Sequence, residues 1–260
     1  MNEPNNYRFI VKSTENTIKL IEMICASTVP LSFTEIKDAL NIPKSSLSNL
    51  MDDMEGYGYL TRNPSTLRYS KGIKLIENSM LCVKNSDILS DIALELDLVC
   101  NQIKETFHAG VLDGTNVVYI GKSSYRSTLS LTSRSGLCAP AHSTAMGRAL
   151  LAQKTDDEVR AIYEGITLER VTPYTLTDLE LLIKELHKVR EQGYSKEVQQ
   201  SCMNASCLSV PVYRMDTEES MFAISVTVSS TKLTPEYEEQ LIETLHACAK
   251  RLSIRESGNV

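Results

Sequence analysis

Tryptophan is absent from this chain of 260 residues, and glycine and proline are scarce, with 11 and 8 residues. Hydrophobic residues make up 42% of the sequence and charged residues 23%. This composition excludes a collagen-like chain, which needs glycine at every third position, and a wholly disordered chain, which is poor in hydrophobic residues. Since domains run to roughly 100–200 residues, the length predicts two globular domains.

The cysteines are too scattered to form a disulfide framework. There are 7 of them, an odd number, and none belongs to a C-x2-C pair. A conceivable zinc set consists of Cys202 and Cys207 with His142 or His187. Because this set lacks the closely spaced ligand pairs that zinc sites have, we expect no metal and no cofactor. Reduced thiols are typical of a cytoplasmic protein.

Long apolar runs are also missing. No stretch approaches the roughly 18 uncharged apolar residues that a membrane-spanning helix requires. The start of the chain, MNEPNNYRF, lacks the basic residues, apolar core and small-residue cleavage site of a secretory signal peptide. The sequence therefore predicts a cytoplasmic protein without a membrane partner.

The formal net charge is −6, so no overall basicity points to nucleic acid. The charge is nevertheless uneven along the chain. Residues 1–85 hold 10 basic and 9 acidic residues, whereas the remainder holds 17 basic and 24 acidic residues. Within residues 37–74 there are six basic and four acidic residues. We therefore expect any polyanion to bind in this part of the chain.

Three helical patterns follow one another in the N-terminal part. The first covers residues 13–26, and the second starts at a capping box formed by Ser32 and Glu35. The third buries a stripe at helical spacing and turns short polar side chains outward. A hairpin follows it over residues 59–70. Such a set predicts a winged helix-turn-helix, although a helical bundle with a solvated serine-rich face remains an alternative.

The outward face of the third helix suits the major groove of DNA. Its small polar side chains allow close approach, its N-terminus offers backbone N–H groups to phosphate, and an asparagine can pair with adenine. Two arginines along the hairpin suit phosphate or minor-groove contacts. The predicted DNA-binding residues are Lys44, Ser45, Ser46, Ser48, Asn49, Arg62 and Arg68.

The second half of the chain mixes hairpins with helices, which is typical of an α+β domain with an antiparallel sheet. Strand pairs are predicted near residues 109–120 and 208–228, and Pro211 inside the latter favours an edge strand or a bulge. Thr177 and Glu180 are predicted to form a second capping box. The expected domains are residues 1–75 (DNA binding), 76–107 (linker helices) and 108–260 (ligand binding).

From about Lys12 to Leu252 the chain resembles the IclR family of bacterial transcriptional regulators. The most specific matching stretch is H-S-T-A-M-G-R-A-L-L-A, residues 142–152, which follows Pro140-Ala141. Other matches are the segments 31–36, 42–46 and 207–212. The resemblance implies a winged helix-turn-helix, a linker helix and a C-terminal GAF-like antiparallel-sheet domain that binds an effector. It also implies homodimers or homotetramers on a palindromic operator, with control of a catabolic operon.

The resemblance also assigns effector contacts to seven positions, which are Thr144, Ala145, Met146, Glu197, Cys207, Ser225 and Thr227. Two departures from the family pattern bear on specificity. Asn49 stands where arginine is common in the recognition helix, and Gln200 stands where glutamate is frequent. We therefore expect the operator and the ligand to differ from those of many relatives.

The residue pattern alone leaves alternative roles open for several of these positions. Ser225 and Thr227 lie two apart on a strand and share a face, which is either a hydrogen-bonding pocket wall or solvent-exposed surface. Glu197 could orient a ligand hydroxyl or be an ordinary surface acid. No G-x-S-x-G elbow, Walker loop or dinucleotide fingerprint indicates an enzyme. We expect a DNA-binding transcriptional regulator that responds to an organic or sugar acid, with repression favoured over activation. An enzyme using the second domain, or a ligand-independent DNA-binding protein, is the alternative.

Overall fold

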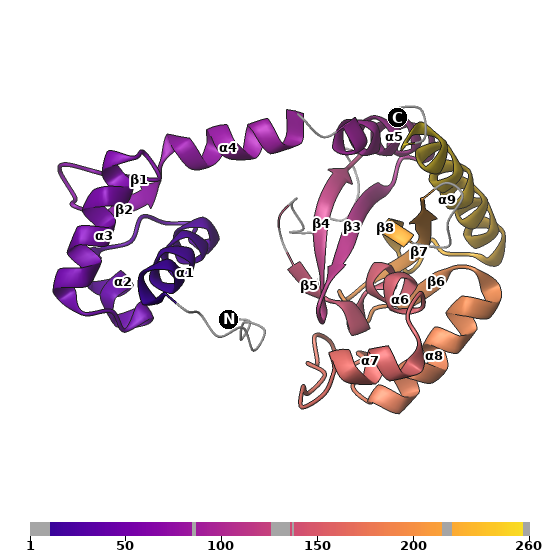
Figure 1. Ribbon diagram of the computed structural model, residues 1–260. Coiled ribbons are helices and arrows are strands. Elements are labelled where there is room, and N and C mark those ends of the chain that lie inside the picture. Colours follow the sequence, from indigo (N-terminus) through magenta and orange to yellow (C-terminus); the bar gives the residue numbers. More distant parts are fainter. Residues whose placement is uncertain (1–10, 85–86, 126–135, 137, 215–219, 257–260) are drawn as a thin grey trace. The chain divides into compact units, whose positions relative to one another are not determined.

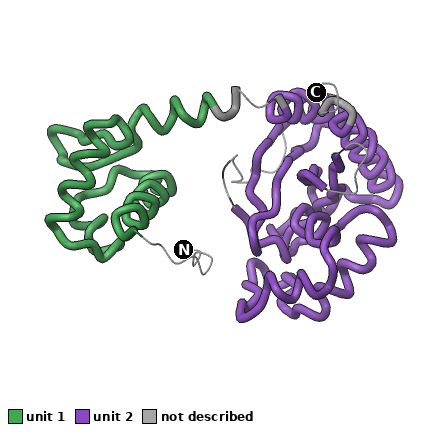
Figure 2. Tube along the Cα trace, in the orientation of Figure 1, with its two compact units in different colours: residues 1–85 green, residues 86–260 purple. Residues whose placement is uncertain are grey.

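The computed structural model describes residues 11–84, 87–125, 136, 138–214 and 220–256. The first ten residues, where we expect no signal peptide, lie outside this part. The chain divides into two compact units, residues 1–85 and residues 86–260 (Figure 2). None of the described helices is both long and apolar enough to cross a bilayer.

The N-terminal unit consists of helices and a small hairpin (Figure 1). Its core gathers apolar side chains from the first three helices and the hairpin, including Leu20 of the first helix and Leu47 and Met51 of the third. This arrangement confirms the predicted winged helix-turn-helix. The elements are α1 (Lys12–Ala26), α2 (Phe33–Leu40), α3 (Lys44–Gly56), β1 (Leu60–Arg62), β2 (Tyr69–Lys71) and α4 (Ile73–Lys84).

Local sequence signals fix the turn between α2 and α3. The predicted capping box is present, because Glu35 N donates to Ser32 Oγ at 3.2 Å and Ser32 N donates to Glu35 Oε2 at 2.6 Å. After α2, Asn41 takes a left-handed conformation with φ of 50°, which asparagine tolerates better than most residues. Pro43 then precedes α3 and provides no side-chain cap.

The hairpin is joined to the helices on both sides. Arg62 pairs with Tyr69 in the β1–β2 register, and Tyr69 also exchanges backbone hydrogen bonds with Leu31 at 2.7 and 2.8 Å. At the end of β2, a Cβ on Gly72 would lie 2.1 Å from the carbonyl oxygen of Gly58. Only glycine allows this approach, which lets α4 follow the hairpin directly.

The C-terminal unit is built on an antiparallel sheet with the strand order β5-β4-β3-β8-β7-β6. Both predicted strand pairs are present, as β3 with β4 and as β7 with β8. Together with the helices, this confirms the predicted α+β class. The strands are β3 (Thr106–Asp113), β4 (Asn116–Ser123), β5 (Cys138–Pro140), β6 (Ser195–Val198), β7 (Ala205–Tyr213) and β8 (Ser220–Ser229).

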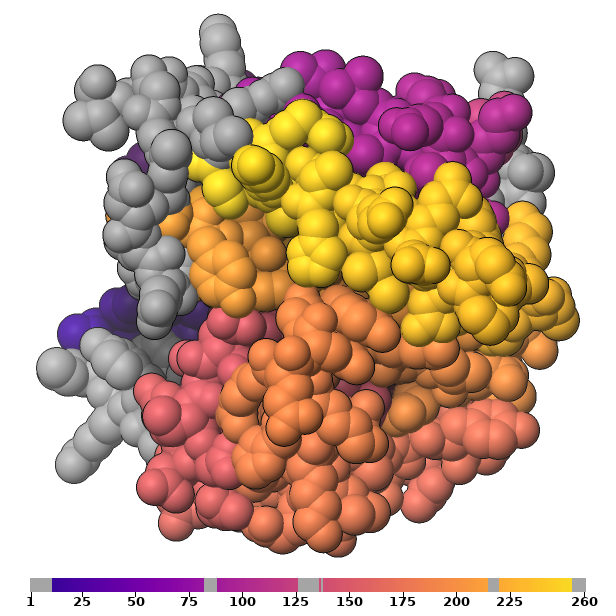
Figure 3. All heavy atoms as spheres, turned by 90° about the vertical axis from the view of Figure 1, so that its right-hand side faces the viewer, coloured from indigo at the N-terminus to yellow at the C-terminus, as the bar shows by residue number. Residues whose placement is uncertain are grey.

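Helices cover both faces of this sheet (Figure 1). On one face, α5 (Asp87–Ile103) and α9 (Pro235–Glu256) lie side by side, as Figure 3 also shows. They pack on apolar side chains such as Phe107 and Val226. Against the other face lie the short helix η1 (Ala141–Ser143), α6 (Ala145–Leu151), α7 (Asp156–Ile162) and α8 (Leu179–Gln192).

The segment predicted as linker helices, residues 76–107, is divided between the two units. The helix α4 belongs to the first unit. In α5, Ile92, Leu96 and Val99 are almost fully buried in the core beneath the sheet. This helix therefore forms part of the second unit's core, and the predicted domain boundaries at residues 75 and 107 stay a prediction.

One local prediction in the second unit is correct only in part, and another is wrong. Pro211 does not lie on an edge strand, because β7 runs between β8 and β6. However, β6 pairs only with residues 206–209 of β7, so among the described strands the part of β7 that carries Pro211 has no neighbour on that side. The register of β7 on β8 shifts just beyond it, between Val212 and Tyr213. Of the two predicted alternatives, the edge strand is wrong, whereas a bulge-type irregularity does lie one residue beyond the proline.

The wrong prediction concerns the start of α8. Its N-cap is Asp178, whose carboxylate accepts from Leu181 N at 2.9 Å. Thr177 instead accepts a hydrogen bond from Arg170, and Glu180 forms an ion pair with Arg160. The predicted capping box fails because aspartate and threonine are both good N-caps and stand next to each other in the sequence.

Candidate functional site

The outward face of α3 is free for contact with a partner. Lys44, Ser45, Ser46 and Asn49 are exposed, and Ser48 is half-buried. Leu47 and Met51, which alternate with them, are buried in the unit's core. No side chain caps the N-terminus of the helix, so its first backbone N–H groups keep the capacity to bind phosphate.

The two predicted wing arginines have different surroundings. Arg62 is exposed and stacks its guanidinium over the ring of Tyr69, 5.6 Å from the ring centre. Arg68 is drawn back toward the helices, because its Nη1 donates to the carbonyl oxygen of Pro30 at 2.8 Å and to Glu35 Oε2 at 3.1 Å. Of these two arginines, Arg62 can therefore reach a phosphate without breaking an ion pair.

In the second unit, strand register brings polar side chains together on one face of the sheet. Ser225 lies opposite Ser209 on one side and His108 on the other. Thr227 lies opposite Cys207, with its Oγ1 3.3 Å from Cys207 Sγ. Ser225 and Thr227 are each 4% exposed, so this face is buried rather than solvated. Of the two readings left open by the sequence, the structure agrees with an interior polar wall.

His108 and Tyr119 complete this wall and were missed from the sequence. Their rings meet edge to face, with centres 5.3 Å apart. Burial, and to a lesser degree the charge of Lys122, lowers the pKa of His108 to about 3. The imidazole is therefore neutral at physiological pH and offers one donor and one acceptor. The alternation of residues along β3 would have placed His108 on this face, because strand residues two apart share a face.

The start of α6 packs against the same strands. Thr144 is the N-cap and accepts from Gly147 N at 3.0 Å, and its own hydroxyl proton has no acceptor among the described residues. Ala145 and Met146 are buried, and α6 packs on β7 and β8. The structure therefore brings the predicted residues of α6 onto the sheet that carries Cys207 and Thr227.

Glu197 is buried on β6, and its carboxylate holds the loop between β6 and β7. Gln200 N donates to Glu197 Oε2 at 2.7 Å, and Ser201 Oγ donates to Oε1 at 2.6 Å. Only 1% of the residue is exposed. Its reading as an ordinary surface acid is therefore wrong, and its first role is structural.

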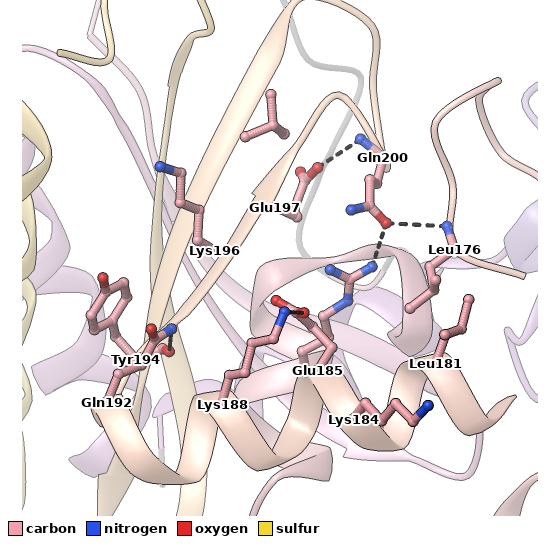
Figure 4. A pocket seen from close by; sticks show the side chains of 12 residues that line it. Leu176, Leu181, Lys184, Glu185, Lys188, Gln192, Tyr194, Lys196, Glu197 and Gln200 are labelled. Carbon is pink, nitrogen blue, oxygen red and sulfur yellow. Dashed lines mark hydrogen bonds and ion pairs between the residues drawn. The ribbon is translucent and has the colours of Figure 1, made fainter. Parts of the chain in front are cut away.

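A groove of about 570 Å³ opens between α8 and β6 (Figure 4). Of the seven predicted effector residues, only Glu197 lines it. The groove is therefore a feature separate from the polar wall under α6. In the described part of the chain, including this groove, no group of three or more His, Cys, Asp or Glu side chains could hold a metal ion.

Comparison with known proteins places both units in one family. Residues 13–64 match the IclR helix-turn-helix domain, and residues 80–254 match the C-terminal domain of bacterial transcriptional regulators of the IclR type. Both matches describe transcriptional regulators rather than enzymes.

Individual relatives agree with the family match. The chain is 30% identical over 224 residues to the HTH-type transcriptional regulator KdgR of Escherichia coli, covering 86% of this chain and 84% of the relative. It is 25% identical to the HTH-type transcriptional repressor AllR of Salmonella typhi over 86% of this chain and 82% of that protein.

A solved structure of an IclR homologue from Microbacterium hydrocarbonoxydans, in complex with 4-hydroxybenzoate, superposes with a TM-score of 0.81 at 21% identity. It covers 94% of this chain and 98% of that one. At this identity the likeness concerns the fold alone. With an uncapped, exposed recognition helix in one unit and a helix-covered sheet in the other, the chain belongs to the IclR family of DNA-binding bacterial transcriptional regulators.

Proposed function

We propose that this regulator represses a catabolic operon and is controlled by a small organic or sugar acid that binds in its C-terminal unit. The observation that carries the proposal is the buried polar wall formed by Ser225, Thr227 and His108, because a purely structural sheet face would bury apolar side chains instead. The repressor AllR and the complex with 4-hydroxybenzoate, which belong to other members, support both halves of the proposal.

On DNA, α3 enters the major groove. Ser45, Ser46 and Ser48 allow close approach, Asn49 reads a base, and Lys44 contacts phosphate at the helix N-terminus. Arg62 reaches the backbone from the wing. Arg68 joins it only by exchanging Glu35 for a phosphate, which costs little because this ion pair is half exposed.

The effector lies between the start of α6 and the strands β7 and β8. The hydroxyls of Thr144, Ser225 and Thr227 hydrogen-bond its polar groups, and Ala145 and Met146 line the apolar side. Cys207 extends the wall from β7. A neutral wall favours a ligand rich in hydroxyl groups, since these donate and accept in turn. Glu197 contacts such a ligand only if it gives up part of its bonding to the loop.

Binding would reach the DNA-binding unit through the sheet. Val226, between Ser225 and Thr227, points to the opposite face and packs in the same core cluster as Leu96 of α5. A ligand that moves β8 therefore changes the packing of α5, which leads back along the chain to α4. This supplies the coupling free energy between the two sites that allosteric control requires.

The operator is a palindrome bound by a homodimer or a homotetramer. The helix α4 leaves Ile73, Ile76 and Met80 largely exposed, with 62%, 48% and 66% of each residue accessible. Spaced at i, i+3 and i+7, these side chains form one apolar stripe, which suits a second copy of the helix. A dimer presents two α3 helices to half-sites about one DNA turn apart.

DNase I footprinting on the DNA flanking the gene tests this proposal. We expect two protected half-sites of inverted sequence with centres roughly 10 base pairs, or a multiple, apart. The footprint weakens when the correct acid is added, and Thr227→Val removes that response without changing the footprint itself. A single half-site would overturn the dimeric arrangement. A footprint that Thr227→Val and every acid leave untouched would favour the ligand-independent alternative.

A further inference from the structure

The groove between α8 and β6 contains more basic than acidic side chains. Arg148, Lys184, Lys188 and Lys196 line it, against Glu185 and Glu197. Lys196 is paired with Glu238 of α9 at 2.5 Å, which leaves a smaller local excess of positive charge. The chain as a whole carries a net charge of −6, so even this excess runs against the average. None of the DNA-binding residues belongs to this groove.

Arg148, at the inner wall, is a buried cation without a direct carboxylate partner among the described residues. Only 1% of it is exposed. Its Nε donates to the carbonyl oxygen of His142 at 2.9 Å, and its Nη2 donates to Gln200 Oε1. Both acceptors are neutral, and Nη1 has no acceptor in the part of the chain that the structure describes. Burial lowers the pKa of Arg148, and the nearby charges of Glu197 and Glu185 offset this lowering only in part. Neither carboxylate forms a direct ion pair with it, and a buried guanidinium is costly unless an anion compensates it fully.

Gln200 directs a second donor into the groove. Its Oε1 accepts from Arg148 and from Leu176 N at 3.1 Å, so the amide cannot be turned around without setting its NH2 group against two donors. The Nε2 atom therefore points the other way, toward the Glu197 side (Figure 4), and no described acceptor binds it. A glutamate at this position would instead have neutralised Arg148.

The acids of the groove are already engaged. Glu185 holds Lys188 at 2.8 Å, and both oxygens of Glu197 accept hydrogen bonds from the β6–β7 loop. Lys184, one turn before Lys188 on α8, has no partner within the described residues. Donors without described acceptors thus line the groove from α6, α8 and the loop after β6.

We propose that this groove binds a small organic polyanion, such as a di- or tricarboxylate or a phosphorylated acid, at a site distinct from the effector wall. One anionic group accepts from Arg148 Nη1 and Gln200 Nε2, as carboxylate and phosphate do with paired N–H donors. A second group meets Lys184 at the rim. The ligand joins α6 to α8 and to the loop that Glu197 holds.

Calorimetric titration of the full chain with citrate and with inorganic phosphate, at constant ionic strength set by sodium chloride, tests the site. Citrate is expected to bind saturably, and Lys184→Gln to weaken it at least fivefold. Lys154→Gln removes the same charge outside the groove and is expected to change the affinity less than twofold. Gln200→Glu is expected to abolish citrate binding without lowering the melting temperature, since it pairs Arg148 internally.

Three results would overturn the proposal. The first is that neither citrate nor phosphate binds saturably above the chloride background. The second is that Lys154→Gln weakens citrate as much as Lys184→Gln does, which is non-specific charge attraction. The third is that Thr227→Val weakens citrate as much as Lys184→Gln does, which would assign the anion to the effector wall. The site is independent of the proposed effector, so an effector response lost in Thr227→Val leaves it standing.

Discussion

Asn49 is the exposed side chain of α3 best suited to reading a base, because its amide can donate to and accept from adenine at once. If it does so, Asn49→Ala lowers the discrimination between operator and random DNA by about 1–3 kcal/mol. Parallel titrations of both DNAs at one salt concentration measure this. An equal loss on both would assign Asn49 to phosphate contact instead.

His108 makes the stability of the C-terminal unit depend on pH. Above about pH 6.5 the imidazole is neutral in the folded and the unfolded chain. Below this pH the imidazole becomes protonated in the unfolded chain, whereas in the folded chain it stays neutral down to about pH 3. The free energy of unfolding therefore falls as the pH is lowered. Between neutral pH and pH 5, His108 is expected to lower the free energy of unfolding by about 2 kcal/mol.

Urea unfolding at pH 7.5 and at pH 5 tests the contribution of this histidine. In His108→Gln, the free energy of unfolding is expected to fall between these two pH values by much less than it does in the unsubstituted protein. The exposed His246 on α9 offers the matched control, His246→Gln. An unchanged pH dependence in His108→Gln would mean that the imidazole charges freely in the folded protein.

Whether the position of a site residue can be predicted from the sequence depends on how far along the chain its partners lie. Ser225 and Thr227 are predictable, because a period of two along one strand puts them on one face. The contact between Arg148 and Gln200 joins residues 52 positions apart, so no local pattern contains it. The family resemblance did indicate Gln200 as unusual, but only the fold explains what its amide binds.

At the start of α8, two neighbouring residues, Thr177 and Asp178, are both suited to be the N-cap, and two substitutions distinguish them. Asp178→Ala removes the N-cap hydrogen bond to Leu181 N and is expected to cost about 1 kcal/mol of unfolding free energy. Thr177→Ala is the matched control, since that hydroxyl does not cap α8 and accepts a hydrogen bond from the exposed Arg170. Urea denaturation of the two variants compares them. A larger cost for Thr177→Ala would restore the capping box predicted from the sequence.

Elements are predictable where local signals agree and uncertain where tertiary packing decides. The Ser32 capping box and the hairpin of β3 and β4 follow from spacing and turn residues. The position of β7 inside the sheet does not, because the short length of β6 makes room for Pro211 without an edge. Likewise, the apolar stripe of α5 predicts a helix but leaves open which unit buries it.

For the molecule as a whole, the exposed stripe on α4 predicts assembly. Ile76→Glu combined with Met80→Glu is expected to convert the oligomer to a monomer in sedimentation experiments. The loss of the second recognition helix should weaken operator binding by about 100-fold, since the two half-sites no longer bind together. Val171→Glu, at another partly exposed apolar residue, serves as the control. An oligomer that survives the double substitution would locate the interface elsewhere.

One titration decides most directly whether this chain is a ligand-controlled DNA-binding regulator. Fluorescence anisotropy follows the full chain binding to DNA from upstream of its own gene, at fixed salt, with and without a panel of small organic and sugar acids that includes 4-hydroxybenzoate. We expect a sequence-specific, salt-sensitive complex whose affinity one acid changes by about tenfold or more, a change that Thr227→Val removes. A specific complex that no acid affects, or no specific complex at all, would contradict this function.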